Sequence, residues 1–198
     1  MAPPKGRKGE PAPTGPEAWI SVLLSHPDPR ARSRAASELA GEKDHPPIAA
    51  LVQALHDPEK EVRAAASAAL AATGTPAIGA LVAALSDADW MVRYRAAEAL
   101  GSIRDGRSVT ALIRALGDGR DHVRYMAAKG LGRLGEARAV GPLTAALGDE
   151  NPFVRRAAGK ALASLRDASA QASGGRPGGR IPGVRGPARR RRHPAGRR

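Results

Sequence analysis

Hydrophobic residues along this chain follow a helical pattern that recurs at a nearly constant interval. Apolar side chains stand at i, i+3, i+4 and i+7 in one segment after another. Two such sets are Ile48, Leu51, Val52, Leu55 and Ile78, Leu81, Val82, Leu85. This spacing places the apolar side chains on one face of an α-helix. No segment alternates apolar and polar residues as a strand does, so the pattern predicts an all-α protein.

A second helical segment with a nearly fixed sequence follows each of these apolar helices. Its pattern is D-x-x-x-x-V-R-x-x-A-A-x-A-L, and the arginines of successive copies are separated by 31, 30, 31 and 31 residues. These arginines are Arg32, Arg63, Arg93, Arg124 and Arg155. Self-similarity at such a period is typical of a solenoid of stacked helix pairs. Asp89 and Asn151 are expected N-caps of second helices, and Gly74, Gly106 and Gly135 are expected at helix exits.

The repeats predict one solenoid over residues 14–166 with two flanking segments. The expected repeats are residues 16–43, 46–74, 75–105, 106–136 and 137–166. Residues 1–13 are rich in Pro, Gly and Lys, residues 167–198 in Arg, Gly and Pro, and both are expected to be disordered. Of the formal charge of +13, the nine arginines after residue 167 contribute +9 and residues 1–13 contribute +2. The solenoid itself is therefore nearly neutral.

Composition removes several classes of protein from consideration. The 198 residues include no Cys, which excludes disulfides, thiolate catalysis and Cys-ligated metals, and only 3% aromatic residues. Residues 1–15 lack the apolar core of a secretory signal, and no apolar run approaches the roughly 18 residues of a membrane span. We expect a soluble, cytoplasmic protein that does not bind a membrane.

The repeated pattern resembles the HEAT repeat, in the short bacterial and archaeal form called phycobilisome-lyase HEAT-like, over about residues 16–166. The resemblance implies a right-handed α-solenoid with a hydrogen-bonded Asp–Arg ladder along it. The implied structural ladder pairs are Asp57 with Arg63, Asp87 with Arg93, Asp118 with Arg124, and Asp149 with Arg155. The first repeat departs from the pattern, with His26 in place of the Asp and Ala31 in place of the Val, as expected of a terminal capping repeat.

A candidate partner-binding strip lies on the second helices of the last three repeats. Solenoids bind partners with residues that differ between repeats, on the concave face lined by the second helices. The strip combines aromatic, Met and Arg side chains, which are favoured in interaction hot spots. Its residues are Trp90, Met91, Tyr94, Arg95, Glu98, His122, Tyr125, Met126, Lys129, Arg133, Phe153, Arg156 and Lys160. The alternative is that the rings fill gaps in an Ala-rich core.

The C-terminal segment is a second candidate site, for polyanions. A low-complexity arginine-rich arm can bind phosphates without sequence specificity and in a salt-sensitive way. Its candidate residues are Arg176, Arg180, Arg185, Arg189, Arg190, Arg191, Arg192, Arg197 and Arg198. The alternative is a solubilising extension without a binding role.

The sequence offers no catalytic residue, metal site or cofactor. None of the five His residues has a second His four residues on, so no zinc-binding helix is expected. HEAT-type deoxyhypusine hydroxylase resembles this architecture but holds iron with His-Glu pairs, which this chain lacks. Some other relatives attach or detach bilins, but the shared repeat alone does not imply that activity.

We therefore expect a non-catalytic scaffold or adaptor that binds another protein on its concave face. The first alternative is a nucleic-acid- or polyanion-binding protein, in which the basic tail acts with Arg95, Lys129, Arg133, Arg156 and Lys160. HEAT-like DNA glycosylases, which place aromatics and Arg on a concave basic surface, are similar in this respect. The second alternative is a bilin-lyase-like or hydroxylase enzyme.

Overall fold

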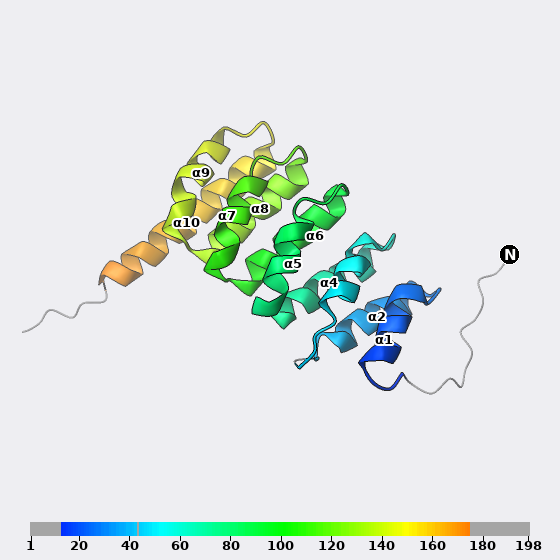
Figure 1. Ribbon diagram of the computed structural model, residues 1–198. Helices are drawn as coiled ribbons and strands as arrows, with labels where there is room; N and C mark the ends of the chain where they lie inside the picture. Colours follow the sequence, from blue (N-terminus) through cyan, green and yellow to red (C-terminus); the bar gives the residue numbers. More distant parts are fainter. Residues whose placement is uncertain (1–12, 43, 175–198) are drawn as a thin grey trace, which may run out of the picture.

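The computed structural model describes residues 13–42 and 44–174 and shows helix pairs stacked side by side in one solenoid (Figure 1). Five pairs follow one another along the described chain, and the second helices of neighbouring pairs contact each other. The second helices are α2 (Pro29–Leu39), α4 (Lys60–Thr73), α6 (Trp90–Ile103), α8 (Asp121–Leu134) and α10 (Pro152–Gly174). The described residues form the all-α solenoid of stacked helix pairs that the sequence predicts.

The first helix of each pair is shorter than the second and, from the second pair on, has 3-10 turns at one or both ends. These helices are α1 (Pro16–Ser25), α3 (Ile48–Gln53), α5 (Ile78–Ala84), α7 (Val109–Ala115) and α9 (Val140–Ala145). The 3-10 turns are η1 (Ala54–His56), η2 (Thr75–Ala77), η3 (Gly106–Ser108), η4 (Ala137–Ala139) and η5 (Ala146–Gly148). Local sequence fixes the starts of several second helices, because Asp89 accepts a hydrogen bond from the Met91 amide and Asn151 from the Phe153 amide, both at 2.8 Å.

The core consists of the Val, Ala and Leu positions of the repeated pattern. Val92 and Leu100 of α6, for example, are fully buried, as are Val123 and Leu131 of α8. The small side chains let neighbouring second helices approach closely. A Cβ atom added to Gly101 of α6 would lie 2.6 Å from the Cα atom of Gly130 in α8. The α6–α8 contact therefore requires glycine at this position.

The Asp–Arg ladder is present, but its side-chain pairing differs from the one that the resemblance implied. Three of the four Asp carboxylates bind the arginine of the preceding repeat: Nε lies 2.6 Å from Oδ2 for Arg32–Asp57 and 2.8 Å for Arg124–Asp149. Arg93 binds Asp118 in the same way. Within a repeat the arginine instead donates to the backbone carbonyl oxygen of the Asp, as Arg124 does to Asp118 at 3.0 Å. The expected residues are therefore hydrogen-bonded within each repeat, but through the Asp carbonyl oxygen. The expected pairing through the carboxylate was wrong, because in the intact rungs the carboxylate projects toward the preceding pair of helices.

One junction of the ladder is broken. Arg63 donates to the carbonyl oxygen of Asp57 at 2.6 Å, but among the described residues it makes no ion pair with Asp87. The intact pairs join residues 25 apart, whereas Arg63 and Asp87 are only 24 apart because the step from Arg63 to Arg93 is one residue shorter. Asp87 lies instead 3.0 Å from Nε2 of His56. The ladder therefore has a gap between the second and third repeats.

The last helix is longer than the sequence predicted. Disorder was expected from residue 167, but α10 continues to Gly174. Residues 168–173 are Ala, Ser and Gln without Pro or Gly, and Ala is the strongest helix former, so the helix can extend past the last packed repeat. The expected disorder of residues 1–12 and of the segment after residue 174 lies outside the described residues.

Within the described part of the chain, no single helix is long and apolar enough to cross a membrane. The segments Lys60–Thr73 and Thr75–Ala84 reach the length and apolar composition of a membrane span only when they are taken together, and the chain bends by 116° between them.

Candidate functional site

The candidate strip lies on α6, α8 and α10, which pack side by side, but its residues fall into two environments. On α6, all five candidates (Trp90, Met91, Tyr94, Arg95 and Glu98) are half-buried. On α8 and α10, His122, Lys129, Arg133, Phe153, Arg156 and Lys160 are exposed, and Tyr125 is half-buried. The structure therefore brings together the α8 and α10 candidates as an accessible surface and makes the α6 candidates its partly covered continuation.

The α6 part of the strip is held by its own contacts. The ring of Trp90 packs against the core and lies 5.3 Å from the ring of His122, centroid to centroid. Arg95 Nη1 lies 2.7 Å from the Glu98 carboxylate, and its guanidinium lies 5.4 Å from the centre of the Tyr94 ring. Burial, with the Glu98 carboxylate adding to it, raises the pKa of the Tyr94 hydroxyl above its ordinary value. These groups form a fixed wall whose charges are mutually compensated.

Met126 does not belong to an exposed strip. Its exposed fraction is 2%, and it packs in the hydrophobic core. Met126 lies three residues after the core residue Val123, and residues at this spacing share one face of a helix. The sequence interpretation, which placed Met126 in the partner-binding strip, was therefore wrong, because the side chain is buried.

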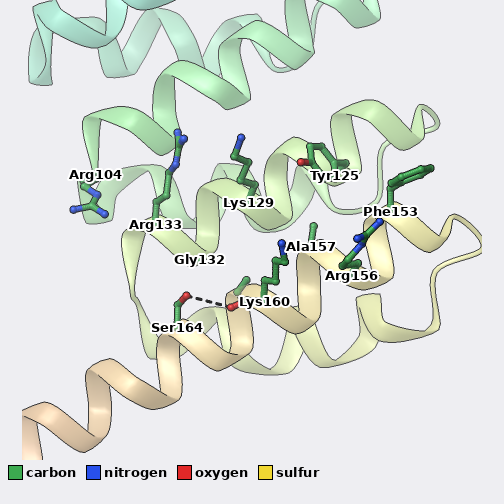
Figure 2. Close-up of a pocket in the computed structure, with 11 residues that line it drawn as sticks. Arg104, Tyr125, Lys129, Gly132, Arg133, Phe153, Arg156, Ala157, Lys160 and Ser164 are labelled. Carbon is green, nitrogen blue, oxygen red and sulfur yellow. Dashed lines mark hydrogen bonds between the residues drawn. The ribbon is translucent and has the colours of Figure 1, made fainter.

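A groove between α8 and α10 gathers most of the remaining candidates (Figure 2). It has a volume of about 570 Å³, which lies within the range of ligand-binding clefts. Gly132 and the small side chains of Ala157 and Ala161 form part of its lining. The larger residues around it are Arg104, Tyr125, Lys129, Arg133, Phe153, Arg156, Lys160 and Ser164. Figure 2 shows the two aromatic rings toward one end and Arg104 and Arg133 toward the other.

The two helices present their groove residues at a regular spacing. Tyr125, Lys129 and Arg133 follow one another at intervals of four residues along α8, so they project from one face. Arg156 and Lys160 have the same interval on α10. The guanidinium of Arg156 lies 5.8 Å from the centre of the Phe153 ring, which is 60% exposed. The groove therefore combines two rows of cations with an open aromatic end.

The lining of this groove contains five cationic side chains and no carboxylate. Arg133 donates to the Ser102 hydroxyl at 3.1 Å, and none of the five lies within 4.0 Å of a carboxylate of the described residues. Other arginines on the solenoid are compensated, such as Arg107 by Asp105 at 2.6 Å. Uncompensated like charges in one concavity create a local positive potential.

Arg104 is a groove residue that the sequence interpretation missed. It is the C-cap of α6 and has φ 58° and ψ 37°, which is the left-handed region. Glycine takes the corresponding C-cap position of α4 and α8, at Gly74 and Gly135. The sequence placed the exit of α6 at Gly106, so Arg104 gave no signal of its own. A non-glycine residue in this region costs roughly 1–2 kcal/mol, and such strain is often retained at functional positions.

A smaller cavity of about 380 Å³ adjoins the aromatic end of the groove. It shares Tyr125 and Phe153 with the groove and is completed by Asp121, His122 and Asn151. His122 Nδ1 lies 2.7 Å from Asp121 Oδ1, and the Asn151 amide donates to the other carboxylate oxygen. The hydrogen bond from His122 holds the pKa of the Asp121 carboxyl below its ordinary value. This cavity therefore places a fixed negative charge next to the cationic groove.

The remaining candidates are not positioned by the structure. The arginines at positions 176–198 lie outside the described residues, so polyanion binding by this segment stays a prediction. Within the described part of the chain, no group of three or more His, Asp or Glu side chains could hold a metal ion.

The helix pairs, the Asp–Arg ladder and the 31-residue interval together define a HEAT-type α-solenoid. The family model for HEAT repeats matches residues 16–78, 48–124 and 115–173, so the chain belongs to the HEAT repeat family. A search of curated proteins found no match.

Several solved structures are similar in fold. The complex of CpcE and CpcF of phycocyanin lyase from a Nostoc species matches with a TM-score of 0.59 and 25% identity, over 84% of this chain and 71% of that one. Human deoxyhypusine hydroxylase matches with a TM-score of 0.52 and 19% identity, over 77% of this chain and 74% of that one. The complex of Kap95p with RanGDP matches with a TM-score of 0.57 and 17% identity, over 76% of this chain and 25% of that one. The first of these supports a HEAT repeat protein of the lyase-like type.

Proposed function

We propose that the protein is a non-catalytic interaction scaffold that binds a partner protein on the concave face lined by α6, α8 and α10. The observation that carries the proposal is the Phe153 ring, which is 60% exposed at the rim of two adjoining cavities. An exposed aromatic ring beside a half-buried one and several arginines has the composition of an interaction hot spot. Tyr125, which packs partly on the core, supplies the rigid second ring.

The HEAT fold and one of its structural neighbours support a partner of this kind. The phycocyanin-lyase neighbour is a complex of two proteins, CpcE and CpcF. Solenoids of stacked repeats generally use an extended second-helix surface to bind their partners. The half-buried α6 residues Trp90 and Tyr94 continue the aromatic surface from the groove toward the preceding repeat. Partner contact across these helices is therefore the function that we infer from the strip.

The proposal can be tested by comparing an exposed apolar side chain at the two cavities with one outside their lining. Leu147 is 43% exposed in η5, lines neither cavity, and serves as the control for Phe153. The full chain, Phe153→Ala and Leu147→Ala would each be used for affinity capture from the native cell after nuclease treatment, with quantitative mass spectrometry. We expect Phe153→Ala to weaken capture of one defined protein by about tenfold or more, since a hot-spot ring contributes 2 kcal/mol or more. Leu147→Ala should leave that capture unchanged.

Cross-linking of the captured complex provides the second readout. Cross-links from the partner should concentrate on Lys129 and Lys160, which lie on the proposed face, and be absent from Lys60 at the start of α4. Equal loss of capture in both alanine variants, or cross-links centred on Lys60, would contradict the proposal.

A further inference from the structure

We infer that the α8–α10 groove binds a short acidic segment of the partner protein in an extended conformation. The inference rests on the proposed scaffold function and names the chemistry of its ligand. Carboxylates of the segment pair with the cations on the two helices, and an apolar side chain at one end packs against Tyr125 and Phe153.

Three cations of the groove have no anionic partner among the described residues. Lys129 on α8 and Lys160 on α10 both line the groove, and Arg104 lies toward one end (Figure 2). These three side chains make no hydrogen bond or ion pair with any other described residue, although compensated arginines are common elsewhere on the surface. Bringing carboxylates among them would replace mutual repulsion with charge-assisted hydrogen bonds. The groove is therefore complementary to an anion that carries several negative charges.

The chain itself does not supply this anion. Residues 168–198 contain nine arginines and no acidic residue, and residues 1–13 contain Glu10 as their only acidic residue. Either segment would bring cations into an already cationic groove. The occupant is therefore expected to come from another molecule.

A peptide suits the groove better than a nucleic-acid strand does. The positive lining is confined to a space of about 570 Å³, and the adjoining cavity carries the fixed carboxylate of Asp121. Farther along the strip, Arg95 is already neutralised by Glu98. A strand of nucleic acid continuing in that direction would meet these carboxylates with its phosphates. A segment of a few residues ends before it reaches them.

The spacing of the cations along α8 indicates which positions of the bound segment are acidic. Successive groove residues on α8, such as Lys129 and Arg133, are four residues apart, which corresponds to a rise of about 6 Å along the helix. Every second side chain of an extended peptide points the same way, at intervals of about 6.6 Å. Acidic residues at alternate positions of the segment would therefore meet successive cations. Gly132 and Ala161 let α8 and α10 approach closely beneath the groove, because a Cβ atom added to Gly132 would lie 2.8 Å from that of Ala161.

The test uses the full chain and a fluorescent peptide whose sequence is Leu-Ser-Glu-Ser-Glu-Ser-Glu. Its affinity is measured by fluorescence anisotropy for the unmodified protein, for Lys129→Gln/Lys160→Gln, and for the control Lys60→Gln/Arg114→Gln. The control removes two exposed cations from outside the groove, so net charge and any tail binding change equally. We expect the groove variant to bind about tenfold more weakly and the control to stay within about twofold. Replacing every Glu of the peptide by Gln should abolish binding.

Three outcomes would overturn the inference. Equal weakening in the two double variants would show that binding is nonspecific. If Lys129→Gln/Lys160→Gln lost binding to a single-stranded oligonucleotide of equal charge but still bound the peptide, the groove would be assigned to nucleic acid. Partner capture that depends on Phe153 but not on Lys129 and Lys160 would leave the scaffold function standing and remove only the acidic ligand. Conversely, groove-dependent peptide binding without Phe153-dependent capture would contradict the scaffold proposal alone.

Discussion

The guanidinium of Arg93 is paired with the carboxylate of Asp118, which lies 25 residues farther along the chain in the next repeat. Nε and Nη2 of Arg93 donate to the two carboxylate oxygens at 2.7 and 2.9 Å, and Nη1 donates to the backbone carbonyl oxygen of Asp87 at 2.8 Å. Asp118 also accepts a hydrogen bond from the Arg120 amide at 2.8 Å. One arginine thus fixes a turn within its own repeat and attaches it to the following repeat.

The first prediction compares an intact rung of the ladder with the broken one. Asp118→Asn should lower the free energy of unfolding by about 2 kcal/mol, because it leaves a mostly buried guanidinium without its anion. Asp87→Asn should cost less than about 1 kcal/mol, since the one ion pair of Asp87 among the described residues is with the exposed His56. In both variants the side-chain oxygen of Asn can still accept the hydrogen bond from the backbone amide two residues farther along. Urea denaturation measures both values, and equal costs would show that the cross-repeat pair is not stabilising.

The second prediction concerns acid. Burial opposes the charged forms of Asp57 and Asp118. Hydrogen bonds from Arg32 and Arg93, together with the backbone amide two residues on and the charges of nearby arginines, nevertheless hold the pKa of each carboxyl below its usual value. The hydrogen bond from Arg124 lowers the pKa of Asp149 in the same direction. Because the folded pKa values lie below the unfolded value of about 3.9, the unfolded state binds more protons as the pH falls.

The contribution of these carboxylates is therefore fully present above about pH 4 and is lost as the pH falls through the lowered folded values. Urea midpoints at pH 7, 4 and 3 should decrease mainly in the last interval. Asp118→Asn should show a shallower decrease than the unmodified chain. An identical pH profile for the two proteins would contradict a role for this rung in acid stability.

The third prediction tests the close approach of α6 and α8. Gly101→Ala would bring a Cβ atom within 2.6 Å of the backbone of Gly130, a contact that requires the helices to separate. We expect a loss of stability of about 1–3 kcal/mol, as for other overpacked cores. Gly79→Ala in α5 is the control, because its Cβ would meet nothing within 4 Å and should raise stability by up to about 1 kcal/mol. Thermal melts of the two variants should shift in opposite directions.

Periodic apolar positions were sufficient to predict the fold, because the second, third and fourth repeats bury the same Val, Ala and Leu positions. The ladder pairing was not predictable in detail. The spacing from Asp118 to Arg124 within a repeat is as regular as that from Arg93 to Asp118 between repeats, so sequence alone does not select the pair. The loss of one residue before Arg93 is visible in the sequence, but its effect on the Arg63–Asp87 rung appears only when the 25-residue separation is known.

The candidate site was predictable to the extent that it depends on helix faces. Tyr125, Lys129 and Arg133 lie on a common face because they are four residues apart, and all three line the groove. Met126 was misplaced because its polarity does not distinguish a core methionine from a surface one, although its spacing from Val123 does. Arg104 could not be found, since its position depends on a left-handed residue at the end of α6 where the sequence offers Gly106 nearby.

The fourth prediction links the strain at Arg104 to the groove. Arg104→Gly should raise the free energy of unfolding by about 1 kcal/mol, because glycine adopts the left-handed conformation at a helix C-cap without the steric cost of a Cβ atom. The same substitution removes one of the five groove cations and should lower the affinity for the acidic peptide by about threefold. Urea denaturation and fluorescence anisotropy provide the two measurements.

Arg104→Ala separates the two effects, because it removes the cation but keeps a Cβ atom in the left-handed conformation. We expect it to weaken peptide binding as much as Arg104→Gly does, with no gain in stability. A gain in stability for both variants would show that charge repulsion, and not the backbone, destabilises this position. Unchanged peptide binding in both would place Arg104 outside the occupied part of the groove. If stability rises only with glycine and affinity falls with both, the strained conformation at the end of α6 is retained because it holds a cation at the groove.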